Sequence, residues 1–385
     1  MGLAEVHSTG PEIGGEPPKG PGEATSGPGA LNPQPWSARA ERANVALTSN
    51  FSGFRRGHLQ NTAPLRLRQL GAFNYWWLAH AVQARVDAFD RTGDGEWLHL
   101  AEATYRRLVQ RNHGRLFNDY FDDMSWLALA SLRLHAATGT QGYLDDAQEL
   151  WRHIDGWGFN ATFGRSVGWR RQQPDYKNAP TNGSFALVSA GLFRVTGDSA
   201  YATTADDLCG WIESRLVDPR TGIVFDGLGR TGDQTVDSDW RFSYNQGLYL
   251  GLLVDSAERH HNPGLLKRAV LTAVSTIDLL APSGVFALET TRPRERRGGD
   301  AGLFKGIFFR HLATLVSQLD PADPDARMLA VFLQQNAEDL WQNLSPTLLS
   351  GDDWQKPPGR TTYLSTQLSA VITLEAAARL EQEGW

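Results

Sequence analysis

The sequence predicts an all-α protein with an (α/α)6 barrel, in which six helical hairpins form a ring. Two observations lead to this fold class. Apolar residues recur at helical spacing in about twelve stretches, and the connections between these stretches alternate strictly between short and long. In a ring of hairpins this alternation places every long connection at one end of the barrel. We therefore expect the helices that follow the long connections to form the inner ring.

The N-terminal part of the chain differs from the rest in composition. Residues 1–36 are rich in Gly and Pro and contain almost no apolar residue that folding would bury. Such a composition is typical of a disordered tail. Although a chain of 385 residues has room for two or three domains, a helical toroid reaches this size as one. We predict one barrel domain at residues 37–385.

Short connections join ten of the twelve predicted helices into five pairs, and the first and last helices lie outside these pairs. Their expected ranges are 37–50, 66–90, 95–112, 122–137, 141–157, 181–196, 198–216, 243–258, 263–280, 302–318, 324–341 and 361–380. The long connections are rich in Gly, Pro, Asn and Asp and lie near 51–65, 113–121, 158–180, 217–242, 281–301 and 342–360. One of them contains the arginine-rich segment 292–297, which we expect to be a solvated loop.

A short motif repeats three times at the short connections. It reads T-G-x-x-x-aromatic-x-x-x-A and begins at Thr92, Thr138 and Thr196. The glycine of each copy can end a helix in the left-handed conformation, and the polar residue after it can cap the next helix. Each copy therefore predicts a tight turn between two helices.

The composition excludes several classes of protein. The net charge is −6 without a long basic run, which argues against a nucleic-acid partner. The single cysteine, Cys209, allows no disulfide within the chain and is expected to be buried and inert. Because the spacings of metal-binding motifs and a Gly-rich phosphate loop are missing from the sequence, we expect neither a metal nor a cofactor.

The sequence also bears on location and assembly. It contains no apolar run long enough to span a membrane and no segment typical of a secretory signal. We therefore expect a cytoplasmic protein, or a secreted one if a signal has been removed. We also expect a monomer.

Two neighbouring carboxylates are the first candidates for chemistry. Asp122 and Asp123 follow aromatic residues and stand just ahead of a strongly apolar helical stretch. Desolvation and mutual repulsion both oppose ionisation of the second carboxylate in such a place. The pair is therefore a candidate catalytic pair. The alternative is a helix cap followed by a first-turn acid, since the helix dipole favours both.

Further polar and aromatic residues lie where the other long connections end. Sugar hydroxyls need short hydrogen-bonding partners, and the apolar faces of sugar rings need flat aromatic surfaces. Helix capping is the alternative for Asn182, and core packing is the alternative for Trp126. The candidate substrate-binding residues are Asn118, Tyr120, Trp126, Trp169, Lys177, Asn178, Asn182, Trp240, Tyr244, Asn245, Gln246, Phe304 and Lys305.

Four short motifs occur in order along the chain. They are YFDDMSWLALA at 120–130, YKNAPTN at 176–182, YNQG at 244–247 and FKGI at 304–307. Together they resemble glycoside hydrolase family 76, the family of endo-α-1,6-mannanases, across about residues 40–380. The chain departs from the family pattern at Leu127, where a second tryptophan is usual, and at 180–181, where an aliphatic-Ser pair is usual.

The resemblance implies an (α/α)6-barrel catalytic domain and a carbohydrate substrate. It implies hydrolysis of α-1,6-mannosidic bonds in mannan or manno-oligosaccharides, with retention and without a cofactor. By position in the motif, Asp122 would be the nucleophile that forms a covalent mannosyl-enzyme. Asp123 would be the general acid that then activates water.

Two alternatives stay open at this point. Similar barrels host sugar epimerases and unsaturated-uronyl hydrolases. An epimerase needs a base on each face of the sugar, and the loop residues His58 and His113 are the candidates for that role. The other alternative is a non-catalytic glycan-binding protein that has kept the barrel.

Overall fold

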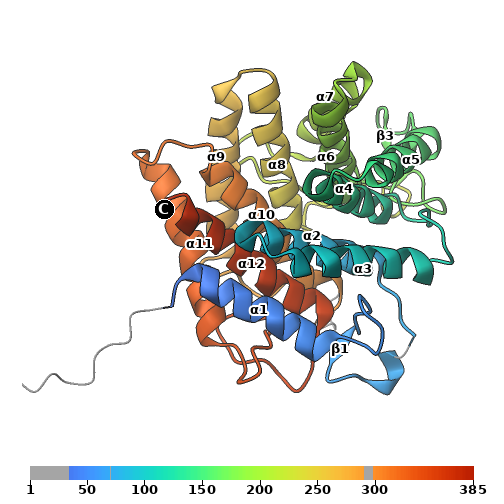
Figure 1. Ribbon diagram of the computed structural model, residues 1–385. Coiled ribbons are helices and arrows are strands. Elements are labelled where there is room, and N and C mark those ends of the chain that lie inside the picture. The colour runs from blue at the N-terminus through green and yellow to red at the C-terminus, as the bar shows by residue number, and fades with distance from the viewer. Residues whose placement is uncertain (1–33, 70, 290–297) are drawn as a thin grey trace, which may run out of the picture. The chain divides into compact units, whose positions relative to one another are not determined.

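Twelve α-helices build the part of the chain that the computed structural model describes, which is residues 34–69, 71–289 and 298–385 (Figure 1). Of the predicted tail, residues 1–33 lie outside the described part, and helix α1 begins at Trp36. The predicted solvated loop at 292–297 also lies outside it.

The observed helices follow the predicted ranges closely. They are α1 Trp36–Phe51, α2 Tyr75–Thr92, α3 Gly95–Arg111, α4 Phe121–Thr138, α5 Gln141–Gly158, α6 Ala179–Thr196, α7 Ser199–Leu216, α8 Ser243–Arg259, α9 Pro263–Leu280, α10 Phe304–Val316, α11 Pro324–Gln342 and α12 Leu364–Gln382. Short 3-10 helices, η1 Leu67–Gln69 and η2 Asp300–Leu303, precede α2 and α10.

The start of α2 is the one large error in these ranges. It was expected at residue 66, but the helix begins at Tyr75. Gly71 has a φ of 82°, a left-handed conformation that interrupts a helix. Asn74 then takes the extended conformation of an N-cap. The residues between the expected and the observed start belong to the long connection instead.

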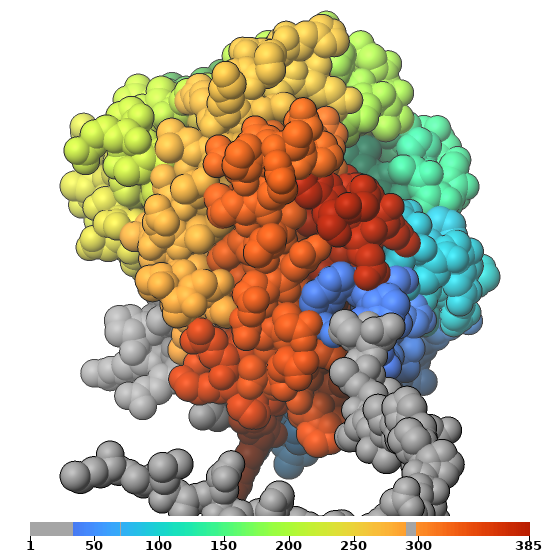
Figure 2. Space-filling view, turned by 90° about the vertical axis from the view of Figure 1, so that its left-hand side faces the viewer, coloured from blue at the N-terminus to red at the C-terminus, as the bar shows by residue number. Residues whose placement is uncertain are grey.

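The even-numbered helices form a closed inner ring. Each packs against the next, from α2 through α4, α6, α8 and α10 to α12, and α12 packs against α2. The odd-numbered helices lie outside. Most of them pack mainly against one inner helix, as α9 does beside α8 in Figure 1, and α11 packs against both α10 and α12. Figure 2 shows part of the outer surface, where α11 lies between α9 and α1. The predicted (α/α)6 barrel and its inner ring are confirmed.

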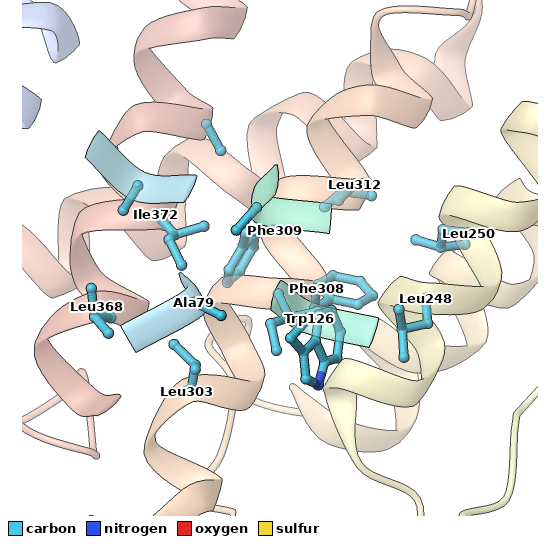
Figure 3. Close-up of a cluster of buried hydrophobic side chains, with 14 of the residues drawn as sticks. Ala79, Trp126, Leu248, Leu250, Leu303, Phe308, Phe309, Leu312, Leu368 and Ile372 are labelled. Carbon is cyan, nitrogen blue, oxygen red and sulfur yellow. The ribbon is translucent and has the colours of Figure 1, made fainter. Parts of the chain in front are cut away.

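Apolar side chains fill the interior of the ring (Figure 3). Ala79 of α2, Trp126 of α4, Leu248 of α8, Phe308 of α10 and Ile372 of α12 are all nearly inaccessible to solvent. Their burial is the main source of stability for a barrel of this kind. Because this core occupies the middle of the ring, any site must lie at one of its ends.

The three copies of the sequence repeat form the same turn. The glycines Gly93, Gly139 and Gly197 end α2, α4 and α6 with φ values of 69°, 68° and 74°. In each copy the threonine before the glycine accepts a hydrogen bond from the backbone N–H two residues later. Asp94 and Asp198 also cap the following helices. The predicted tight turns are confirmed.

Short antiparallel strands, which we did not predict, join the long connections. Strand β1 Thr62–Ala63 pairs with β6 Thr362–Tyr363, and β4 Lys177–Asn178 pairs with β5 Gly227–Leu228. A third pair, β2 Phe159–Asn160 and β3 Ser166–Val167, lies within one connection. The first two pairs hold different long connections together. None of the helices in the described part of the chain has the length and apolar character needed to cross a bilayer.

Candidate active site

A cleft of about 740 Å³ lies at the end of the barrel that carries the long connections. Its walls come from these connections and from the first turns of α2, α4, α8 and α10. Ten of the residues selected from the sequence line it: Asn118, Tyr120, Asp122, Asp123, Trp126, Trp169, Asn178, Trp240, Tyr244 and Phe304. The fold therefore brings most of the candidates from four separate motifs to one place.

Asp122 lies in the first turn of α4 and is held by two N–H donors. Its Oδ1 accepts a hydrogen bond of 3.0 Å from the backbone N–H of Asp123, and its Oδ2 accepts one of 3.1 Å from the indole of Trp169. Burial raises the pKa of Asp122, while these two hydrogen bonds oppose the rise. The carboxylate keeps part of its surface open to the cleft although protein surrounds it.

Asp123 has fewer donors and a charged neighbour. Its Oδ2 accepts a hydrogen bond of 2.8 Å from Nδ2 of Asn118. The backbone N–H of Tyr120 donates to Oδ1 of Asn118 and so fixes the orientation of that amide. Burial, and then the charge of Asp122, raise the pKa of Asp123 well above its ordinary value.

The two environments favour different protonation states of the two carboxyl groups. The donors to Asp122 favour its ionised form, whereas burial beside that charge favours the protonated form of Asp123. Helix capping explains little of this arrangement. The N-cap of α4 is Tyr120, whose side chain makes no capping hydrogen bond. Asp122 does bond one first-turn N–H, but Asp123 accepts its hydrogen bond from a side chain.

Aromatic rings form much of the wall around the pair. Tyr244 and Phe304 stack with their centroids 3.9 Å apart. The guanidinium of Arg230 lies 4.0 Å from the ring centroid of Trp240. Trp126 serves both the cleft and the core, because it lines the cleft but is only 3% exposed. Trp126 therefore packs in the core, as the alternative role expected, and one part of it also lines the cleft.

Asp119, Asp226 and Asp300 are further carboxylates that line the cleft and were not among the named candidates. Oδ1 of Asp300 accepts hydrogen bonds of 3.1 Å from the indoles of both Trp76 and Trp77. Asp226 is buried and accepts hydrogen bonds from the hydroxyl of Tyr176 at 2.6 Å and from Nδ2 of Asn245 at 2.9 Å. Burial raises the pKa of Asp226 despite these donors.

Of Asp226 and Asp300, only Asp300 could have been found from the sequence. Asp300 lies in a Gly-rich run that closes a long connection, which is the kind of segment from which the other candidates were chosen. Asp226 lies in the middle of its connection, where nothing in the sequence distinguishes it. The lining residues that were not among the named candidates are Phe73, Asn74, Tyr75, Trp76, Asn112, Asp119, Tyr176, Asp226, Arg230, Phe242 and Asp300.

Two lysines selected as substrate-binding residues do not line the cleft. Lys177 is fully buried, and its Nζ donates to the carbonyl of Ser166 at 2.7 Å. Nζ of Lys305 donates to the carbonyl of Asp352 at 2.8 Å. Burial lowers the pKa of each ammonium to about 8. Both side chains are long enough to reach past the cleft wall and hold a neighbouring connection in place.

Three selected amides also lie behind the wall. Asn182 accepts from the backbone N–H of Val167 and donates to its carbonyl, at 2.8 and 3.0 Å. Gln246 makes the same pair of bonds with Val224, at 2.8 and 2.7 Å. Asn245 donates to Asp226. Asn182 is not the N-cap of its helix either, because Asn178 caps α6. These amides bind the protein's own loops.

The remaining candidates have less support. His58 and His113, the possible bases of an epimerase, do not line the cleft. In the described part of the chain, no group of three or more His, Cys, Asp or Glu side chains is placed to hold a metal ion. The chemistry that the cleft offers is that of carboxylates beside aromatic surfaces.

Comparison with known proteins places this barrel in a family. The family model described as glycosyl hydrolase family 76 matches residues 36–384. The chain belongs to glycosyl hydrolase family 76. Among family 76 structures, the GH76A alpha-1,6-mannanase from Salegentibacter sp. HEL1_6 is similar, with 30% identity and a TM-score of 0.83 over 89% of this chain and 99% of that chain.

Other relatives are similar over different shares of their length. The Lin0763 protein from Listeria innocua is 36% identical, with a TM-score of 0.85 over 91% of this chain and 99% of that chain. The mannan endo-1,6-alpha-mannosidase DFG5 from Candida albicans is 26% identical over 52% of this chain and 46% of that protein. The match to the mannan endo-1,6-alpha-mannosidase DCW1 from Candida glabrata spans only 18% of that protein, with 36% identity over 20% of this chain. The chain thus spans less than half the length of these two fungal relatives.

Proposed function

We propose that this family 76 protein hydrolyses α-1,6-mannosidic bonds in mannan or manno-oligosaccharides with retention of anomeric configuration. One observation carries the proposal. Asp122 and Asp123 lie side by side in an aromatic-walled cleft. Two N–H donors oppose the rise in the pKa of Asp122, whereas burial and the neighbouring charge raise the pKa of Asp123 well above its ordinary value. Hydrolysis with retention needs this division between two carboxyl groups.

A solved relative supports the choice of residues and substrate. The Salegentibacter alpha-1,6-mannanase has been described as an inactive variant in which two consecutive aspartates are replaced by alanine, in complex with alpha-1,6-mannotetrose. A second inactive variant carries asparagine at both positions and holds alpha-1,6-mannotriose. Loss of activity together with retained binding is what we expect for this chain if Asp122 and Asp123 act on a bound sugar.

The proposed reaction has two steps. In the first, the Asp122 carboxylate attacks the anomeric carbon, and Asp123 gives its proton to the departing glycosidic oxygen. A covalent mannosyl-enzyme and a shortened glycan result. In the second step Asp123, now ionised, takes a proton from water while the water oxygen displaces Asp122 from the anomeric carbon. Both carboxyl groups then return to their starting forms.

The cleft walls would hold the sugar chain. We assign substrate contacts to Asn118, Tyr120, Trp126, Trp169, Asn178, Trp240, Tyr244 and Phe304, all of which line the cleft. Their rings offer flat apolar surfaces, and their amides and hydroxyls offer hydrogen bonds to sugar hydroxyls. Lys177, Asn182, Asn245, Gln246 and Lys305 act one layer further back, since each bonds protein groups behind the wall.

Product analysis tests the function directly. The protein and its Asp122→Asn and Asp123→Asn variants are incubated with linear α-1,6-mannan, and the products are followed by mass spectrometry and proton NMR. We expect the wild type to release manno-oligosaccharides whose new reducing ends are first α, and both variants to release none. A folded wild type that binds mannan without releasing sugar would favour the glycan-binding alternative, and release of a first-formed β-anomer would exclude retention.

A further inference from the structure

A second hollow, of about 400 Å³, lies between the α1–α2 connection and α3. Its lining includes Phe54 and Leu65 together with the cationic side chains of Arg55, Arg107 and Arg111. None of the described residues that line this hollow is acidic. The hollow therefore combines apolar surface with positive charge, unlike the carboxylate-rich cleft.

The α1–α2 connection, part of which lines the hollow, carries large apolar side chains that are highly exposed. Phe54 has a relative exposure of 110% and Leu67 of 84%, the two highest values among the large apolar side chains in the described part of the chain. Leu65 is 41% exposed. Two such side chains on one connection present apolar surface that water solvates poorly, which is typical of an interaction site.

The same connection is locally basic in an acidic protein. Residues 51–72 contain four arginines and no aspartate or glutamate, although the whole chain has a net charge of −6. The charges of Arg111, Arg107 and Arg55 add to the effect of burial in lowering the pKa of His58, which lines the hollow. This effect on His58 indicates a positive potential inside the hollow.

The hollow adjoins the cleft. Nη2 of Arg111 donates to the carbonyl of Ala72 at 2.6 Å, and the Arg111 guanidinium lies 5.0 Å from the ring centroid of Phe73. Phe73 lines the cleft, whereas Ala72 and Arg111 line the hollow. A surface that engaged the α1–α2 connection would therefore lie next to the mouth of the cleft.

We propose that the α1–α2 connection docks this protein on a bilayer rich in anionic phospholipid. Phe54 and Leu67 would enter the boundary between headgroups and acyl chains, and Arg55 and Arg68 would bind lipid phosphates. The pairing of exposed apolar side chains with neighbouring guanidiniums fits that boundary, where apolar and anionic groups lie a few ångströms apart. A nucleic acid would offer phosphates without the apolar layer that Phe54 and Leu67 require.

Vesicle binding tests this docking independently of any glycosidase activity. The full chain is sedimented with vesicles of phosphatidylglycerol and phosphatidylcholine, or of phosphatidylcholine alone, at low and at high salt. We expect binding to the anionic vesicles only, and weaker binding at high salt. The paired changes Phe54→Ser with Leu67→Ser, and Arg55→Gln with Arg68→Gln, should each lower the partition coefficient by about tenfold or more.

Matched controls distinguish binding through the α1–α2 connection from nonspecific adsorption to vesicles. Val331→Ser removes an apolar side chain that is 60% exposed on α11, and Arg215→Gln removes an exposed arginine of α7. Both controls should bind like the wild type. All the changed side chains are exposed, so we expect every variant to fold. Thermal unfolding of each variant checks this.

Four results would overturn the proposal. The first is absence of binding to anionic vesicles, and the second is unchanged binding by both paired variants. The third is binding that glycerol phosphate abolishes and that the apolar pair of changes leaves intact, because the hollow would then hold free phosphate rather than a bilayer. Equal binding of a single-stranded oligonucleotide through the same arginines would likewise make the surface a general polyanion site.

Discussion

The indole N–H of Trp169 donates a hydrogen bond of 3.1 Å to Oδ2 of Asp122. The backbone of Trp169 adds a second link, because its carbonyl accepts from the N–H of Phe121 at 3.1 Å. The long connection before α6 is thus joined to the first turn of α4 beside the carboxylate pair. A side chain from one connection stabilises the charge on a helix that begins in another.

Replacing Trp169 with phenylalanine should move the acidic limb of the pH profile. The change keeps an aromatic ring and removes a donor that favours the ionised form of Asp122, so the pKa of Asp122 rises. Because we propose that Asp122 reacts as a carboxylate, the acidic limb of kcat/KM should move upward by about 1 pH unit, the lower end of what a hydrogen bond to a charged group contributes.

The measurement is the pH dependence of kcat/KM on a soluble manno-oligosaccharide. Trp240→Phe is a suitable control, since Trp240 lies against Arg230 and does not donate a hydrogen bond to Asp122 or Asp123 in the structure. An acidic limb that stays in place in the Trp169 variant would show that this hydrogen bond does not tune Asp122.

Azide should distinguish the two aspartates by the product that it forms. With an aryl α-mannoside that has a good leaving group, Asp122→Gly should give β-mannosyl azide, because azide displaces the leaving group directly. Asp123→Gly should give α-mannosyl azide, because azide attacks the mannosyl-enzyme. Proton NMR of the products determines the anomeric configuration of the mannosyl azide. The reverse pattern would exchange the roles of the two residues.

The charge of Asp123 should lower the stability of the fold. Its pKa is raised in the folded protein by burial and by the charge of Asp122. Such a group binds more protons in the folded state, so stability falls as pH rises from the ordinary aspartate value of 3.8 through the folded pKa. Asp123→Asn removes this effect and should add about 1–2 kcal/mol to the free energy of unfolding at pH 8.

Urea unfolding at pH 4 and pH 8 measures that effect. The free energies of unfolding of Asp123→Asn and of the wild type should differ little at pH 4 and clearly at pH 8. The control is Asp145→Asn, on the exposed face of α5. Unlike Asp123→Asn, it should leave the difference between the free energies of unfolding at pH 4 and pH 8 unchanged. A gain of equal size at both pH values would point to altered packing rather than to the charge.

The amide of Asn182 should matter for stability. Asn182→Leu keeps a similar volume but leaves the N–H and carbonyl of Val167 without their side-chain partner. Buried polar groups without partners destabilise a fold by about 1–3 kcal/mol each, so we expect a loss of about 2–4 kcal/mol in urea unfolding. Gln335→Leu, on the exposed face of α11, should change stability by less than about 0.5 kcal/mol. A loss no larger than that of the control would contradict the structural role of the amide.

Much of this molecule follows from local sequence features. The glycines Gly93, Gly139 and Gly197 end helices wherever they occur in the repeat, because only local backbone conformation is involved. Apolar periodicity and the alternation of connection lengths are then enough to predict the ring of helical hairpins. The adjacent Asp122 and Asp123 could be recognised for the same reason, since their closeness to each other and to apolar residues is written in the chain.

The direction of individual side chains could be decided only by the tertiary structure. Asn178 and Asn182 lie one turn apart at the start of α6, yet the first lines the cleft and the second holds Val167. The rotation of a helix about its axis, and the path of the loop beside it, determine which of the two meets the cleft. Asp226 reaches the cleft because β5 pairs with β4, a contact between residues about fifty positions apart. Local sequence determines where helices begin and end, but which polar groups share a cleft depends on packing between distant segments.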